Sequence, residues 1–90
     1  MHLSDDIHNL VEGMLLDELN THPPELPSQE WADLCCLVLN KVPPRYVRHD
    51  VDAVYYMSDD EWDHIQRKLR AAIKESIEFL RGQDARHPEE

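Results

Sequence analysis

The chain has little glycine, few cysteines and no long apolar run. Glycine occurs only twice in 90 residues, which argues against turn-rich β architectures and glycine-built phosphate loops. The two cysteines, Cys35 and Cys36, are adjacent, and an adjacent pair forms a disulfide only with strain. No C-x-x-C or H-x-x-x-H spacing occurs either. We therefore expect two small, packed thiols, with no metal site and no cofactor.

Basic residues are also scarce, and their scarcity limits the partners. Nine Lys and Arg stand against 19 Asp and Glu, so the formal net charge is −10. DNA, RNA and anionic membranes all require a basic surface, and we expect this chain to bind none of them. The longest apolar run, residues 34–39, is far shorter than the roughly 20 residues of a membrane span. The first residues carry acids where a secretory signal carries bases, so we expect a cytoplasmic protein.

Two helices are predicted in the first half of the chain. Apolar residues recur every three or four positions after Ser4, which we interpret as the N-cap of a helix that ends near Asn20. A second helix is expected from Ser28, again as N-cap, to about Asn40. Because the second helix is apolar over most of its circumference, it needs cover on more than one side. This pattern predicts a homodimer in which the second helices share one core.

A different pattern follows the Pro43-Pro44 pair. Residues 45–57 are rich in β-branched and aromatic side chains and favour a short extended segment. A Ser-x-x-Glu capping box at residues 58–61 then begins a long amphipathic helix, which we expect Gly82 to end. The predicted fold class is thus all-α, with three main helices and a short extended segment after a Pro-Pro loop. We expect one domain over residues 1–82 and a mobile tail over residues 83–90.

The charges are distributed unevenly along the chain. Residues 1–40 contain eight acids and no Lys or Arg, whereas residues 41–48, here called the basic loop, contain Lys41, Arg45, Arg48 and no acid. Arginine binds phosphate through a planar fork, and the ring of Tyr46 offers a stacking surface for a base. The alternative is structural: Lys41 complements the dipole of the second helix, and the two arginines pair with Asp50 and Asp52.

Residues 39–47, with the sequence LNKVPPRYV, resemble the signature of the late competence development protein ComFB family. The similarity extends over residues 3–80. It implies a small bacterial cytosolic protein, mostly helical, homodimeric and without known catalysis. Some members of that family are linked to cyclic dinucleotides, especially cyclic di-GMP, and others to competence or surface motility. Certain relatives carry cysteine clusters that suggest zinc, but this chain has only one adjacent pair, so zinc is not transferred to it.

Together, the charge pattern and the resemblance predict a cyclic di-GMP receptor that acts as a signalling adaptor and is not an enzyme. The nucleotide is expected at Asn40, Lys41, Pro44, Arg45, Tyr46 and Arg48. A ligand-free dimeric adaptor, whose acidic N-terminal face contacts a basic protein, is the alternative function. We expect Trp31 and Trp62 in the core or in a dimer contact, and the six histidines in solvent.

Overall fold

The computed structural model describes residues 7–48 and 57–86, with side chains as far as residue 82. Within this part of the chain the fold is mostly helical, with three α-helices, as predicted, and one small sheet of two strands. No helix in the described part is long and apolar enough to cross a membrane. The elements in chain order are β1 (His8–Asn9), α2 (Leu10–Thr21), the 3-10 turn η1 (Ser28–Glu30), α3 (Trp31–Lys41), β2 (Tyr46–Val47) and α5 (Asp59–Arg86).

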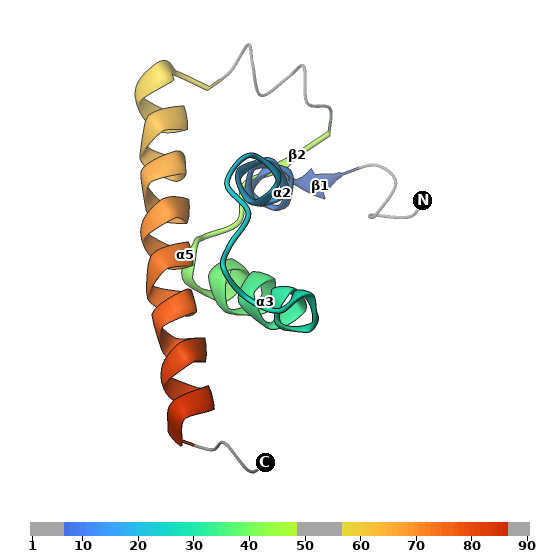
Figure 1. Ribbon diagram of the computed structural model, residues 1–90. Helices are drawn as coiled ribbons and strands as arrows, with labels where there is room; N and C mark the ends of the chain where they lie inside the picture. The colour runs from blue at the N-terminus through green and yellow to red at the C-terminus, as the bar shows by residue number, and fades with distance from the viewer. Residues whose placement is uncertain (1–6, 49–56, 87–90) are drawn as a thin grey trace.

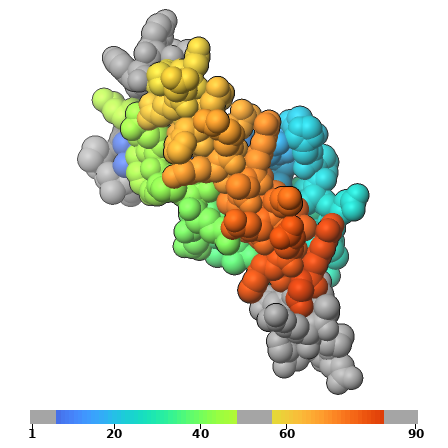
Figure 2. Space-filling model, turned by 90° about the vertical axis from the view of Figure 1, so that its left-hand side faces the viewer, coloured from blue at the N-terminus to red at the C-terminus, as the bar shows by residue number. Residues whose placement is uncertain are grey.

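The long helix α5 organises the molecule. It stands along one side of the fold, and α2 and α3 pack against the same side of it (Figure 1). In Figure 2, which looks onto α5, the end of α3 and the basic loop lie along one edge of the helix. The segment that joins α2 to α3 lies along the other edge. The two edges of α5 therefore have different surroundings.

Apolar side chains from all three helices form one core. Leu34 and Val38 on α3 and Leu69 on α5 are almost completely buried where these two helices make the most extensive contact in the fold. Trp31 and Trp62 are partly buried; the Trp31 indole N–H donates to the carbonyl of Leu26 at 3.2 Å, and Trp62 packs against the core. The buried apolar residues are Leu10, Val11, Met14, Leu15, Leu19, Leu34, Val38, Val42, Met57, Leu69, Ala72 and Leu80.

The first helix begins later than predicted. Residues 8 and 9 are extended, and α2 starts at Leu10 with Asn9 as its N-cap. The cause is tertiary: β1 pairs antiparallel with β2, with His8 opposite Val47 and Asn9 opposite Tyr46, so these residues cannot join the helix. Ser4 lies outside the described residues. At its other end α2 stops at Thr21, close to the predicted end before the two prolines.

The Asn9 carboxamide connects two parts of the fold. Its Oδ1 accepts hydrogen bonds from the backbone N–H of Val11 at 3.2 Å and of Arg45 at 2.8 Å. Replacing Asn9 with alanine is expected to destabilise the protein by about 1–2 kcal/mol, because the substitution removes a helix cap and leaves the Arg45 N–H without its acceptor. Urea unfolding measures this loss. Asn20→Ala, at an exposed position on the same helix, is the matched control and should change stability by less than about 0.5 kcal/mol. Equal effects of the two substitutions would contradict this role of Asn9.

The second helix also begins differently. Ser28 was predicted as its N-cap, but it opens η1 and makes no side-chain capping bond. The N–H of Glu30 bonds the carbonyl of Pro27 at 2.9 Å, and this 3-10 turn occupies the predicted first turn of the helix. The regular helix α3 therefore starts only at Trp31. It ends at Lys41, one residue beyond the predicted end.

The last helix confirms the predicted start but not the predicted end. The Oγ of Ser58 accepts the N–H of Glu61 at 3.1 Å, as expected in a capping box. Gly82 does not end the helix: it has no positive φ, and α5 continues to Arg86. A glycine ends a helix by adopting the left-handed conformation, and here it keeps the helical one. Residues 83–86 of the predicted mobile tail are thus helical, and residues 87–90 lie outside the described part. The extended prediction holds at Tyr46–Val47, whereas residues 49–56 are not described.

Candidate functional site

The backbone of the basic loop is fixed at both ends. Where α3 stops, the N–H of the buried Val42 bonds the carbonyl of Val38 at 3.0 Å. Three residues later Arg45 is held through both of its backbone groups: its N–H donates to the Asn9 side chain, and its carbonyl accepts the N–H of Leu10, each at 2.8 Å. The loop is therefore ordered before any ligand arrives, which lowers the entropic cost of binding.

The Arg45 side chain is much less constrained than its backbone. Its guanidinium lies 3.4 Å from a carboxylate oxygen of Glu61 at the start of α5, and the two side chains are 45% and 37% exposed. An exposed ion pair of this kind contributes about 0–1 kcal/mol. The structural alternative paired the arginines with Asp50 and Asp52, which lie outside the described residues; the partner observed for Arg45 is Glu61.

The Lys41 side chain contacts a different part of α5. Its Nζ lies 3.4 Å from a carboxylate oxygen of Glu75, and Lys41 also occupies the last turn of α3, where its charge complements the helix dipole. Glu75 and Glu61 are 14 residues apart on α5, which corresponds to about 21 Å along the helix. The ion pairs therefore hold Lys41 and Arg45 apart.

The other predicted binding residues fall into two groups, one exposed on the basic loop and one held at the end of α3. Tyr46 is 63% exposed and Arg48 is exposed, whereas Val47 between them packs against the core. This alternation places Tyr46 and Arg48 on the solvent side of the strand. The Arg45 guanidinium is held near Glu61 instead. Pro44 is also exposed. Asn40, by contrast, donates from Nδ2 to the carbonyl of Cys36 at 2.8 Å within its own helix. Pro44, Arg45, Tyr46 and Arg48 are thus all exposed on the basic loop, whereas Asn40 and Lys41 are engaged at the end of α3 by Cys36 and Glu75.

The adjacent cysteines differ in burial. Cys35 is partly buried and Cys36 is exposed, and both are free thiols. Burial raises the pKa of the Cys35 thiol, which therefore stays protonated and unreactive at neutral pH. Within the described residues, no group of three or more His, Cys, Asp or Glu side chains could hold a metal ion.

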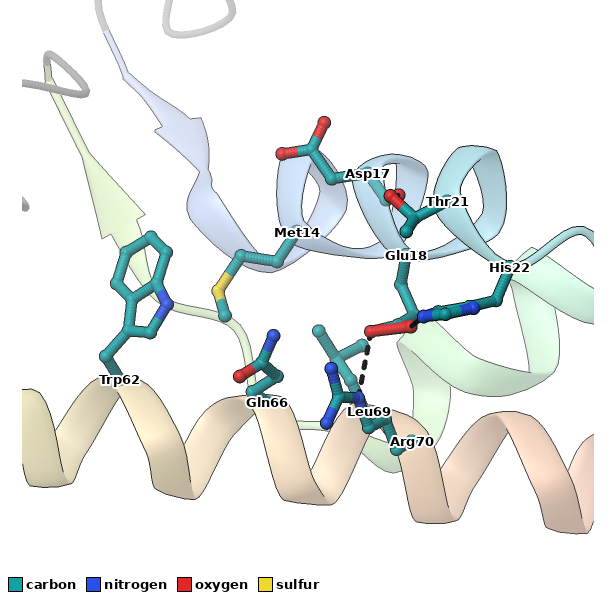
Figure 3. Close-up of a pocket in the computed structure, with 9 residues that line it drawn as sticks. All are labelled: Met14, Asp17, Glu18, Thr21, His22, Trp62, Gln66, Leu69 and Arg70. Carbon is teal, nitrogen blue, oxygen red and sulfur yellow. Dashed lines mark hydrogen bonds and ion pairs between the residues drawn. The ribbon is translucent and has the colours of Figure 1, made fainter.

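A cleft between α2 and α5 was not predicted from the sequence. It has a volume of about 150 Å³ and is closed at one end by an ion pair in which Nε of Arg70 donates to Glu18 at 3.0 Å (Figure 3). The only sequence signal for it is the i, i+4 spacing of Glu18 and His22, whose side chains lie 3.7 Å apart. Its lining residues are Met14, Asp17, Glu18, Thr21, His22, Trp62, Gln66, Leu69 and Arg70.

Comparison with known proteins agrees with the signature in the basic loop. The family model described as late competence development protein ComFB matches residues 8–83, which include all the described helices up to the last turn of α5. No curated protein and no solved structure matches the chain. Because the family model covers most of the chain, the protein belongs to the late competence development protein ComFB family.

Proposed function

We propose that this protein is a cytoplasmic cyclic di-GMP receptor that binds its ligand at the basic loop and signals without catalysis. The observation that carries the proposal is the contrast between the fixed backbone of Arg45 and the exposed side chains of Arg45 and Tyr46. The backbone of Arg45 is fixed through two 2.8 Å hydrogen bonds, while its guanidinium and the adjacent Tyr46 ring are open to solvent. A fixed backbone with exposed phosphate-binding and stacking groups suits a nucleotide.

The energetics favour exchange of the Arg45 ion pair for a phosphate. The exposed pair with Glu61 contributes about 0–1 kcal/mol. A hydrogen bond between charged groups contributes about 1.5–3 kcal/mol. The Glu61 side chain is 37% exposed, so its carboxylate can turn into solvent when a phosphate takes its place. Arg48 has no ion-pair partner among the described residues.

Because ion pairs hold Lys41 and Arg45 apart, the proposed binding residues should contribute unequally to the affinity. Arg45, Tyr46 and Arg48, with Pro44 beside them, form the part of the site that a single nucleotide reaches first. Asn40 and Lys41 contribute only if the ion pair with Glu75 opens, since Lys41 is held toward the middle of α5. The proposal therefore assigns the larger share of affinity to the segment around β2.

Calorimetric titration of the purified protein with cyclic di-GMP tests the proposal, with cyclic di-AMP as the comparison ligand. We expect a dissociation constant in the micromolar range or below, about −8 kcal/mol, and a weaker signal with cyclic di-AMP. Absence of heat and of any thermal shift with both nucleotides would remove the receptor function.

We also propose that the receptor is a homodimer. Leu16 on α2 and Phe79 on α5 are more than half exposed, and Leu37 and Leu39 on α3 are only partly buried. A second copy packed on these side chains would cover them, and a chain of 90 residues gains stability from such cover. Sedimentation equilibrium should give twice the 10.6 kDa chain mass. A monomeric mass at micromolar concentration would contradict the dimer.

The ligand-free adaptor remains the second candidate because one observation favours it. Glu12, Asp17 and Asp33 are exposed on α2 and α3, and the chain has no Lys or Arg before Lys41. A basic protein partner fits this surface, whereas cyclic di-GMP does not. Binding of a basic protein partner that is unaffected by nucleotide and is abolished by Lys substitutions at these three acids would favour the adaptor.

A further inference from the structure

The cleft between α2 and α5 is distinct from the basic loop. Arg70, which closes the cleft, stands nine positions after Glu61, the partner of Arg45, and nine positions correspond to about 180° around a helix. The cleft and the Arg45 guanidinium therefore lie on opposite sides of α5. The volume of about 150 Å³ is also too small for a whole dinucleotide, because pockets for ligands of that size span about 300–1,000 Å³. A cavity of this size holds one aromatic ring system.

The closed end of the cleft carries the guanidinium of Arg70, whose side chain is 56% exposed and is held by an ion pair with Glu18. The Glu18 side chain is only 12% exposed and binds Nε of Arg70 at 3.0 Å. That contact occupies one edge of the guanidinium and leaves its two terminal nitrogens without a partner among the described residues. Figure 3 shows these nitrogens on the side of the cleft that faces Gln66. The ion pair thus positions the guanidinium through Nε and leaves the two terminal nitrogens to bind a ligand.

The wall opposite this end offers the N–H edge of the Trp62 indole and a further free donor. Neither the indole N–H of Trp62 nor the amide of Gln66 has a hydrogen-bond partner among the residues that the structure describes. Both groups face the space between the two helices, beneath Met14 (Figure 3). Met14 and Leu69 are buried and make the rest of the surface apolar. The cleft combines an apolar surface with donors that have no acceptor among the described residues.

The charges around the cleft select the ligand. An anion would face the Glu18 carboxylate and the Asp17 carboxylate at the rim, and a compact cation would face Arg70. A neutral planar ring with acceptors along one edge avoids both conflicts. Among nucleobases, guanine presents two adjacent acceptors, O6 and N7, in the geometry that an arginine fork binds through two parallel hydrogen bonds.

We infer that this cleft binds a single guanine base, as a nucleoside without phosphate, with Arg70 on its O6/N7 edge and the indole edge of Trp62 at the opposite end. Adenine replaces the O6 acceptor with an amino donor, which opposes Arg70. The inference does not depend on dinucleotide binding at the basic loop. The guanine base could come from a free nucleoside or from a cyclic dinucleotide, and the experiment distinguishes these two ligands.

The test uses tryptophan fluorescence of the Trp31→Phe variant, in which Trp62 is the remaining tryptophan. Guanosine should quench the emission with saturation, at least about tenfold more tightly than adenosine. Absence of quenching by guanosine at its solubility limit, in protein with normal circular dichroism, would overturn the inference. Quenching by cyclic di-GMP alone would also overturn it, because the cleft would then be part of a dinucleotide site. If Trp31→Phe fails to fold, a shift in melting temperature of the wild-type chain with guanosine provides the same comparison.

Two variants of Arg70 and a matched control complete the test. Arg70→Gln should remove the preference for guanosine, and Arg70→Lys, which can keep the contact with Glu18 but lacks the fork, should weaken guanosine binding about tenfold. Arg81→Gln is the control, because Arg81 makes a similar exposed ion pair on the same helix, with Glu25 at 3.8 Å, and does not line the cleft. Unchanged guanosine affinity in both Arg70 variants, or equal loss in Arg81→Gln, would contradict the assignment.

Discussion

Replacing Arg45 with alanine is expected to weaken cyclic di-GMP binding by about tenfold or more, which corresponds to at least 1.4 kcal/mol, while the fold survives. The binding loss follows from removal of the exposed guanidinium that is proposed to hold a phosphate. The fold survives because Arg45 is anchored through its backbone N–H and carbonyl, which alanine retains. Loss of the exposed pair with Glu61 should change the free energy of unfolding by less than about 1 kcal/mol.

Titration calorimetry and urea unfolding of the same variant measure the two quantities. Arg67→Ala is a suitable control, because Arg67 is exposed on α5 and has no ion-pair partner among the described residues. The Arg67→Ala substitution removes the same charge without changing the basic loop. Because surface charges at a distance are screened, the affinity of this variant for cyclic di-GMP should stay within about threefold of the wild-type value. Lys41→Ala should give an intermediate loss. Equal losses in all three variants would point to a general charge effect and contradict a site at Arg45.

Replacing Leu34 with alanine is expected to destabilise the protein by about 2–5 kcal/mol, a large part of the stability of a small domain. Leu34 is completely buried where α3 packs against α5, so its truncation removes apolar contacts and leaves a cavity. Because α3 leads directly into the basic loop, the variant should also lose nucleotide binding as it unfolds. Thermal unfolding followed by circular dichroism measures the shift.

Leu16→Ala provides the matched control for the core substitution. Leu16 is 58% exposed on α2, so the same change of side chain removes little buried surface within one copy. Its effect on the unfolding of the chain should be below about 0.5 kcal/mol. If Leu34→Ala were as mild as Leu16→Ala, the packing of α3 on α5 described above would be wrong.

Local signals in the sequence located some element ends correctly and missed others. The His22-Pro23-Pro24 segment ends α2 and the capping box at Ser58 begins α5, because both act within a few residues. The start of α2 was missed because Asn9 is held in a strand by Tyr46, which lies 37 positions further along the chain. The Asn9-x-x-Glu12 spacing, itself typical of a capping box, was the signal that could have found this start.

The candidate site shows the same division between local and distant information. The concentration of Lys41, Arg45 and Arg48 in one loop is visible in the sequence, and so is the signature around Tyr46. The carboxylates that hold two of these cations come from α5, 16 positions after Arg45 and 34 positions after Lys41. The cleft depends on a contact between Arg70 and Glu18, 52 residues apart. Such contacts follow from the packing of whole helices, which local spacing does not specify.

The most direct test of the central claim is an NMR titration of ¹⁵N-labelled protein with cyclic di-GMP. The proposed function predicts saturable shifts that are largest at the amides of Arg45, Tyr46, Val47 and Arg48, with smaller shifts at Lys41. The core amides of α3 around Leu34 should move little, because the loop backbone is already fixed before binding. Spectra that do not change with ligand, or saturable shifts confined to residues outside the basic loop, would contradict the account.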